Sequence, residues 1–82
     1  MPVYFFDIYE GGTLIPDSRG MELERLDEVE REAAETAAAI ARDRLPGSNA
    51  QTVKVKVRDG AHRHVMTATA ALTIERVDAP GR

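Results

Sequence analysis

Cysteine and tryptophan are absent from the 82-residue chain, which holds only two phenylalanines and two tyrosines. Without cysteine the chain can form no disulfide, no thiolate metal site and no cysteine nucleophile. No stretch approaches the roughly 20 apolar residues that a membrane-spanning helix needs. The opening MPVYFFD carries no basic residue and Asp7 interrupts its apolar run, which does not fit a signal peptide. We therefore expect a soluble, cytoplasmic protein.

The charge is unevenly distributed along a chain whose net charge is −3. Residues 1–50 hold eleven acidic and five basic side chains, whereas residues 51–82 hold three acidic and six basic ones. The overall balance disfavours a uniformly basic nucleic-acid binder. The asymmetry either serves solubility alone or sets a basic face against an acidic helix, an arrangement that supports self-association.

The first third of the chain predicts a β-hairpin. Residues 3–10 alternate in the manner of a half-buried strand. Gly11-Gly12 forms a turn, residues 13–15 return as a short strand, and Pro16 ends it. Residues 17–20 form a second turn, followed by a short third strand at residues 21–23. The two sets of the alternating strand are Tyr4, Phe6 and Ile8 on one face and Val3, Phe5, Asp7 and Tyr9 on the other.

A helix from Asp27 to Leu45 follows. Its apolar residues recur at spacings of three and four, with Asp27 as the expected N-cap and Pro46-Gly47 as the end. The residues expected to face the sheet are apolar and mostly small: Leu26, Val29, Ala33, Ala34, Ala37, Ala38, Ile40 and Ala41.

Two further strands complete the pattern. In residues 51–58 the valines at 53, 55 and 57 alternate with polar side chains, which is typical of an antiparallel strand with one buried face. Residues 65–77 alternate again, and because thirteen residues is long for one strand we expect a bulge or break near Ala70-Ala71. The inward set is Met66, Ala68, Ala70, Leu72 and Ile74, and the outward set is Thr67, Thr69 and Thr73.

The order of elements is therefore β-β-α-β-β. It predicts a two-layer α+β domain over residues 1–78, with an antiparallel sheet of three or four strands and one helix on one face, followed by a disordered tail at residues 79–82. One helix covers one face of the sheet and leaves the other open. The pattern leaves the strand order undetermined.

No set of catalytic residues assembles in the sequence. The two serines, Ser18 and Ser48, lack a nucleophile context, and no glycine-rich phosphate loop precedes the helix. His62 and His64 could share a face and chelate a metal, with Asp59 as the nearest third ligand, but they equally fit exposed polar residues at a hairpin end. We predict no enzyme, no catalytic residue, no metal site and no cofactor.

The open sheet face holds the candidate interface. A row of Lys54, Lys56 and Arg58 lies beside Val3 and Phe5 if the first strand neighbours the strand at residues 51–58. Such a row fits three roles: shielding of a solvated face, a protein interface, or a stacking platform for single-stranded nucleic acid. The seven candidate residues are Val3, Phe5, Lys54, Lys56, Arg58, Thr67 and Thr69.

Several stretches carry a family resemblance: MPxYFFD at the start, DxxGxEL at residues 17–23, the Ala-rich acidic helix, ARDxLP at residues 41–46 and VxVRD at residues 55–59. They resemble an uncharacterised family of short bacterial proteins known as a domain of unknown function. The resemblance implies a stand-alone domain without an assigned activity. The chain departs from the family at Arg25, where members commonly carry an acidic residue. It also departs at residues 59–63 (DGAHR), where members usually carry Asp-Glu-x-Gly-Arg, so the resemblance implies that the histidine pair is a local variation.

A second likeness is one of layout. The hairpin, the turn with Pro16, Asp17 and Gly20, and the Ala/Glu-rich helix are similar to the HicB-type antitoxin domain, a partial ribonuclease-H-like fold.

These observations give three hypotheses of function. The first is a non-enzymatic interaction module that forms a homodimer or docks on another protein through the open sheet face. The second is an antitoxin-like domain that neutralises a small basic partner through its acidic helix. The third is weak binding of single-stranded nucleic acid.

Overall fold

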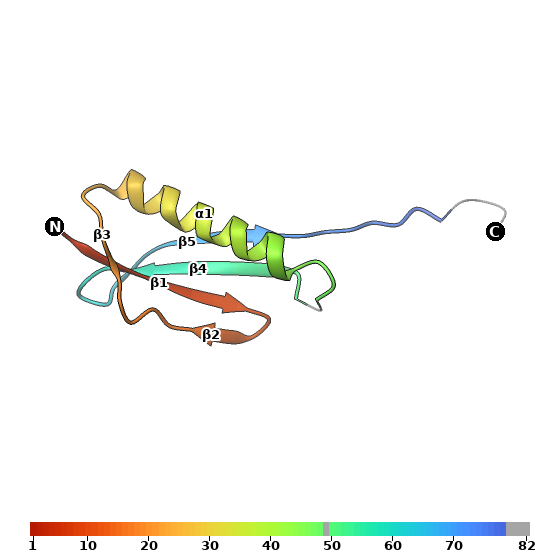
Figure 1. Cartoon of the computed structure of the whole chain (residues 1–82), viewed down its shortest axis with the longest axis horizontal. Helices are drawn as coiled ribbons and strands as arrows, with labels where there is room; N and C mark the ends of the chain where they lie inside the picture. Colours follow the sequence, from red (N-terminus) through yellow and green to blue (C-terminus); the bar gives the residue numbers. More distant parts are fainter. Residues whose placement is uncertain (49, 79–82) are drawn as a thin grey trace.

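The computed structural model describes residues 1–48 and 50–78 and confirms the expected α+β order (Figure 1). The expected tail at residues 79–82 lies outside the described residues. The elements are β1 (Val3–Glu10), β2 (Thr13–Ile15), β3 (Met21–Glu22), α1 (Leu26–Arg44), β4 (Thr52–Arg58) and β5 (His64–Ala71).

The antiparallel sheet has the order β2-β1-β4-β5, and the short β3 pairs with the start of β1. Counting β3, the sheet has five strands. The long strands β1 and β4 form its centre, with Phe5 opposite Arg58 and Tyr9 opposite Lys54. Because β1 neighbours β4, the basic row of β4 lies beside Phe5, as expected for this arrangement.

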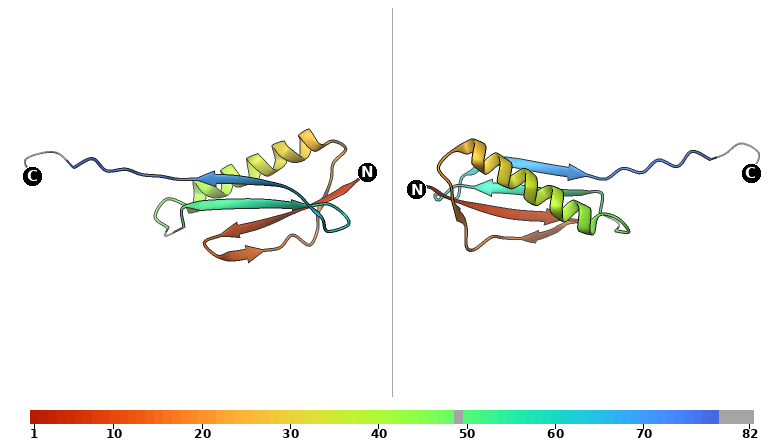
Figure 2. Two further views of the ribbon diagram at one scale, coloured as in Figure 1. Left: turned by 180° about the vertical axis from the view of Figure 1, so that it is seen from behind. Right: turned by 45° about the horizontal axis from the view of Figure 1, so that its top comes forward.

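The core lies between α1 and one face of the sheet (Figure 2). Val29, Ala33 and Ala37 of the helix are buried against the sheet, as the three- and four-residue spacing predicts. The strand faces also follow the predicted alternation. The buried sheet residues are Tyr4 and Phe6 of β1 and Val53, Val55 and Val57 of β4.

The start of α1 differs from the prediction. The expected N-cap Asp27 is wrong, because the helix begins at Leu26 and Arg25 is the N-cap residue. The Glu28 carboxylate, three positions into the helix, accepts the backbone N–H groups of Glu24 and Arg25 at 3.1 Å each. This reach back from the first turn satisfies free amides without a capping side chain at Arg25.

The covered stripe of α1 is narrower than predicted. Ala34 and Ala38, expected to face the sheet, are exposed, and Leu26 at the first helical position is 58% exposed. The reason is the position of the helix. It packs on β4 and β5, and β5 is the last strand of the sheet, so no strand among the described residues lies beneath the side of α1 beyond β5.

The last strand ends at Ala71, at the break that the length of the pattern predicted. A register shift between Val57 and Arg58 also interrupts the β4–β5 ladder. Leu72 still donates its N–H to the Gln51 carbonyl at 3.0 Å, but the next residues leave the body as an extended segment (Figure 1). Ile74, expected to face the helix, is 75% exposed. No helix in the described part of the chain is long and apolar enough to cross a membrane.

Candidate functional site

An ion pair joins the two central strands on the open face of the sheet. Arg58 of β4 donates from Nε and Nη2 to the Asp7 carboxylate of β1 at 2.7 and 3.0 Å, and Nη2 also donates to the Asp17 carbonyl at 3.0 Å. Asp7 is only 7% exposed. A bidentate pair of this kind fixes the relative orientation of both side chains.

Asp17 closes the edge of β1 beyond the end of β2. Its carboxylate accepts the N–H of Phe6 at 3.1 Å and the N–H groups of Arg19 and Gly20 at 2.9 and 3.2 Å. Its own N–H donates to Asp7 Oδ1 at 2.9 Å. A single side chain therefore takes the place of the strand that Pro16 ends.

Both carboxylates are held in the ionised form. The hydrogen bonds from Arg58 are the main cause that lowers the pKa of Asp7, and they outweigh its burial, which raises that pKa. Burial raises the pKa of Asp17, but the hydrogen bonds from the N–H groups of Phe6, Gly20 and Arg19 together lower it by more, so the net shift is downward. Asp7, Asp17 and Arg58 therefore form a clamp whose two carboxylates are ionised at neutral pH.

The aromatic part of the predicted interface is covered by the chain itself. The Arg58 guanidinium lies 4.8 Å from the centre of the Phe5 ring, and His62 stacks on that ring at 6.1 Å. Gly20 packs so closely that an added Cβ would lie 2.7 Å from Val3 Cγ1. Val3 and Phe5 are thus half-buried rather than exposed as expected.

The remaining predicted residues lie together on β4 and β5. Lys54 pairs in register with Thr69, and Lys56 with Thr67. Lys54, Thr67 and Thr69 are exposed, whereas Lys56 places its ammonium 4.4 Å above the centre of the Tyr9 ring. The structure therefore brings the predicted set onto one face but engages part of it in contacts within the chain.

The two histidines have different partners. Arg58 Nη1 lies 2.8 Å from His62 Nδ1, and the guanidinium is the donor of this contact because arginine has no acceptor. His64 Nε2 lies 2.7 Å from Thr67 Oγ1. Within residues 1–48 and 50–78, no group of three metal-ligating side chains is found.

The outer edge of β5 is a feature that the sequence did not identify. Because the Leu72 N–H bonds to the carbonyl of Gln51, directly before β4, the alternation of an antiparallel ladder directs the backbone groups of Thr67, Thr69 and Ala71 away from β4. In the described residues no strand pairs with this side of β5. The opposite edge is short, since β2 has three residues and Pro16 follows. In contrast, β5 has eight residues, with no proline, lysine or acidic residue to protect its edge.

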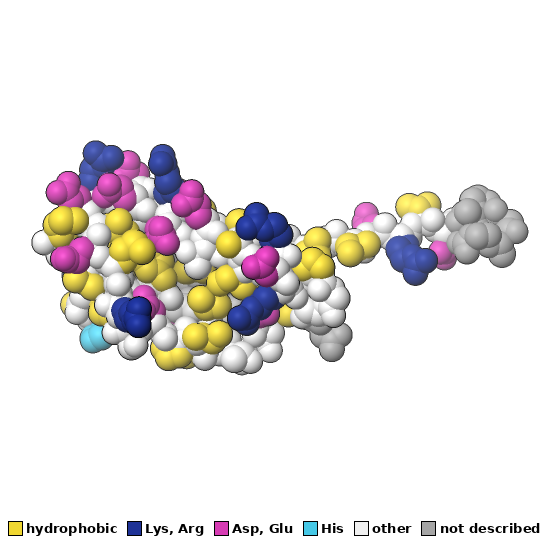
Figure 3. Space-filling view, viewed as in Figure 1, with side chains coloured by type: hydrophobic (Ala, Val, Ile, Leu, Met, Phe, Trp, Pro, Cys, Tyr) yellow, Lys and Arg dark blue, Asp and Glu magenta, His cyan; other side chains and the backbone are white. Residues whose placement is uncertain are grey.

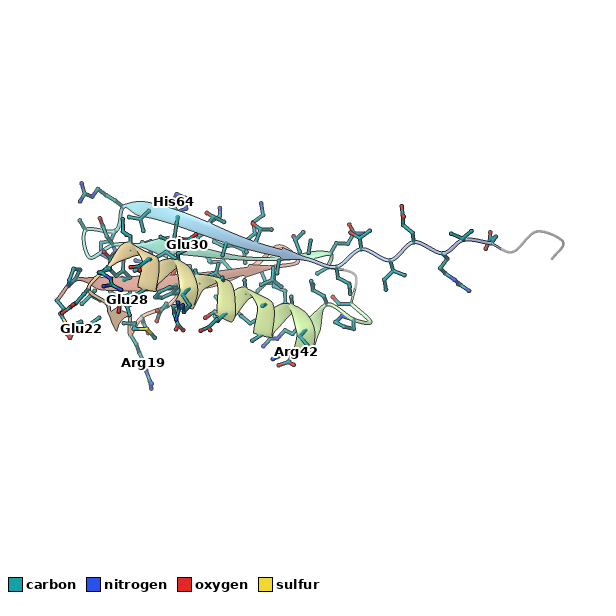
Figure 4. All side chains as sticks on the ribbon, turned by 90° about the horizontal axis from the view of Figure 1, so that it is seen from above. Arg19, Glu22, Glu28, Glu30, Arg42 and His64 are labelled. Atoms are coloured by element: carbon teal, nitrogen blue, oxygen red, sulfur yellow. The ribbon has the colours of Figure 1, made fainter. Side chains whose placement is uncertain are left out.

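A groove of about 600 Å³ runs between this strand and α1. Small side chains on α1 form one wall, and Glu30 lies at the end where β5 begins, on the same side of the helix as His64 (Figure 4). The apolar residues of the two walls are Ala33, Ala34, Ala37 and Ala38 of the helix and Met66, Ala68 and Ala70 of the strand. The sequence held one indication of this groove. Ala34 and Ala38 extend the row of small residues on the helix beyond the residues needed to cover one face of the sheet.

The structure thus defines a two-layer α+β domain, with one helix on an antiparallel sheet that has one open face and, in the part of the chain that the structure describes, a long unpaired edge along β5 and a short one along β2. The family profile described as Domain of unknown function (DUF6894) matches residues 3–71, and the chain belongs to this family. The matched region ends at Ala71, the last residue of β5. No curated protein and no solved structure matches the chain.

Proposed function

We propose that this protein is a non-enzymatic interaction module that associates with itself through the edge of its sheet. The unpaired eight-residue edge of β5 beside an apolar groove carries the proposal. An added strand satisfies the outward N–H and C=O groups of such an edge, and neighbouring pockets take its alternate side chains. The edge and the groove together offer both kinds of contact.

The open sheet face, with Val3, Phe5 and the basic row, has less support as the docking surface. Arg58 is bound by Asp7 and covers Phe5, and Lys56 lies over Tyr9. A partner on this face would have to replace contacts that the chain already makes. Of the seven residues predicted for this face, Lys54, Thr67 and Thr69 are exposed.

Light scattering on a sizing column, over a range of concentrations and at low and high salt, tests self-association. We expect a concentration-dependent dimer that persists at high salt, because strand pairing and apolar contact are weakly screened. Dissociation at high salt would instead support docking between the acidic helix and the basic face. A monomer at every concentration would contradict the proposal.

The other two hypotheses have weaker support. Acidic and basic side chains are interleaved along α1 (Figure 3), where Arg25 and Arg31 lie among Glu28, Glu32 and Glu35. This pattern offers no uniform acidic face to a basic toxin, and co-purification of a small basic partner would reverse that judgement. For single-stranded nucleic acid, a salt-dependent affinity would be required.

A further inference from the structure

The extended segment beyond β5 has the features of the missing strand. We propose that residues 72–77 of a second copy pair antiparallel with the outer edge of β5, so that the dimer is reciprocal. This inference rests on the proposed function and names its partner. The segment lies beyond the region matched by the family profile, so the inference concerns this particular chain.

The first argument is the exposed apolar character of the segment. Ile74 is 75% exposed and Val77 is 91% exposed. Apolar side chains follow the chain as it leaves the body (Figure 3). Leu72 and Ile74 continue the alternation of Ala68 and Ala70, which face the helix side of the sheet. A strand formed by this segment would therefore direct Leu72 and Ile74 to the layer that holds the groove.

The second argument concerns the source of the strand. The segment follows β5 directly, and it would need a tight turn to lie against its own strand. Residues 71–74 are Ala-Leu-Thr-Ile, with none of the Gly, Asn, Asp or Pro residues that such turns use. The segment can cover the same edge only in a second copy.

The third argument is the fit of side chains and charge. With Ala71 on a two-fold axis, Leu72 of the second copy lies opposite Ala70 and Ile74 lies opposite Ala68, so large side chains enter an alanine-lined groove. Arg76 then lies opposite Met66, at the end of the groove where Glu30 is found. The segment therefore complements the groove in size and in charge. The two-fold axis covers both edges at once, because each copy donates and receives one segment.

The substitution Ile74→Asp tests the inference directly. Ile74 is exposed in the single chain, so the variant keeps its fold, which circular dichroism verifies. In the dimer the change places two carboxylates in apolar grooves, and we expect the dissociation constant to rise roughly 100-fold or more. The matched control is Leu14→Asp, an equally large change at a 47% exposed residue of β2 on the open face. It should leave the dissociation constant unchanged.

Charge reversal provides an independent test. Glu30→Lys and Arg76→Glu should each weaken the dimer, by roughly threefold to tenfold, because each places like charges together. The double variant restores an opposite pair and should return the affinity close to that of the original chain. Additive weakening in the double variant would overturn the predicted pairing.

The outcomes separate this inference from the proposed function. A dimer that survives Ile74→Asp but dissociates with Leu14→Asp would overturn the inference and move self-association to the open face. A dimer that survives both changes would also overturn it and leave self-association intact. A chain that is monomeric before any substitution would contradict both.

Discussion

Gly20 closes the turn that follows Asp17 against the open face of the sheet. Its φ of 75° lies in the left-handed region, and the space for a side chain is taken by Val3 and Phe5. Gly12 has a similar φ of 84°, but a Cβ there would meet nothing within 4 Å. Both glycines therefore need a left-handed backbone, but only at Gly20 would a side chain also clash with its neighbours.

The substitutions Gly20→Ala and Gly12→Ala exploit this difference. Gly12→Ala should lower the free energy of unfolding by roughly 1 kcal/mol, the cost of a left-handed residue with a side chain. Gly20→Ala should cost about 2 kcal/mol or more, because its Cβ also displaces Val3 and Phe5. Urea unfolding of both variants measures the difference. Equal losses would mean that the close packing at Gly20 contributes nothing.

The ion pair between Asp7 and Arg58 should stabilise the centre of the sheet. Asp7→Ala removes the carboxylate that pairs with Arg58 and leaves Arg58 Nε and the N–H of Asp17 without an acceptor, and we expect a loss of about 2 kcal/mol. The exposed pair Arg25–Asp27, whose side chains are 69% and 68% exposed, is the control. Asp27→Ala should give no measurable change in urea unfolding. A loss at Asp27 as large as that at Asp7 would contradict the role of burial.

The same clamp predicts acid sensitivity. The pKa values of Asp7 and Asp17 are lowered from 3.8 in the folded chain, so their ionised forms favour folding. This contribution is complete above the unfolded-state value and is lost as the pH falls through 3.8 to the lowered pKa values. Urea unfolding over a pH series should show a decline below about pH 4 that is shallower in Asp7→Asn. An identical decline in that variant would contradict the assignment.

At the scale of elements, neighbouring residues of β5 direct their backbone N–H groups to opposite sides of the strand. Thr69 directs its N–H outward, whereas the Ala70 N–H points to β4. Thr69→Pro should keep the fold and abolish dimerisation, since proline is tolerated on an edge. Ala70→Pro should instead cost about 3 kcal/mol of stability. Light scattering and thermal unfolding of both variants distinguish the two effects, and a dimer that survives Thr69→Pro would contradict pairing at this edge.

Most of the secondary structure, and the faces of its central strands, could be predicted from the sequence. Alternation in residues 3–10 and 51–58 gave the correct faces of β1 and β4, because side chains on a strand point to opposite faces in turn. The helix followed from its apolar spacing, although its start did not, since Glu28 satisfies the first amides instead of a cap at Asp27.

The edge and the groove could not be predicted in the same way. Antiparallel strands of similar pattern fit several orders, and the sequence pattern did not specify the observed order β2-β1-β4-β5, which places β5 at an edge. The exposure of Ala34 and Ala38 depends on that order. The contacts of Arg58 with Asp7 and Asp17 depend on a turn whose path the sequence pattern did not specify.

At the scale of the whole molecule, the proposed dimer is one continuous sheet. A two-fold axis perpendicular to the sheet at Ala71 places both helices on one face and both open faces on the other. The basic rows at Lys54 and Lys56 then lie on one side of the assembly, and the acidic residues of α1 lie on the opposite side. Self-association would therefore combine the basic rows of two chains on one face of the assembly and their acidic helix residues on the other.

Hydrogen–deuterium exchange of the β5 amides, followed by NMR at two protein concentrations, tests this account most directly. The amides of Ala68 and Ala70 bond to β4 and should be protected at both concentrations. Those of Thr67, Thr69 and Ala71 should become protected only at the concentration where the dimer forms. Rapid exchange of these three amides in a sample that light scattering shows to be dimeric would contradict strand pairing at the edge of β5.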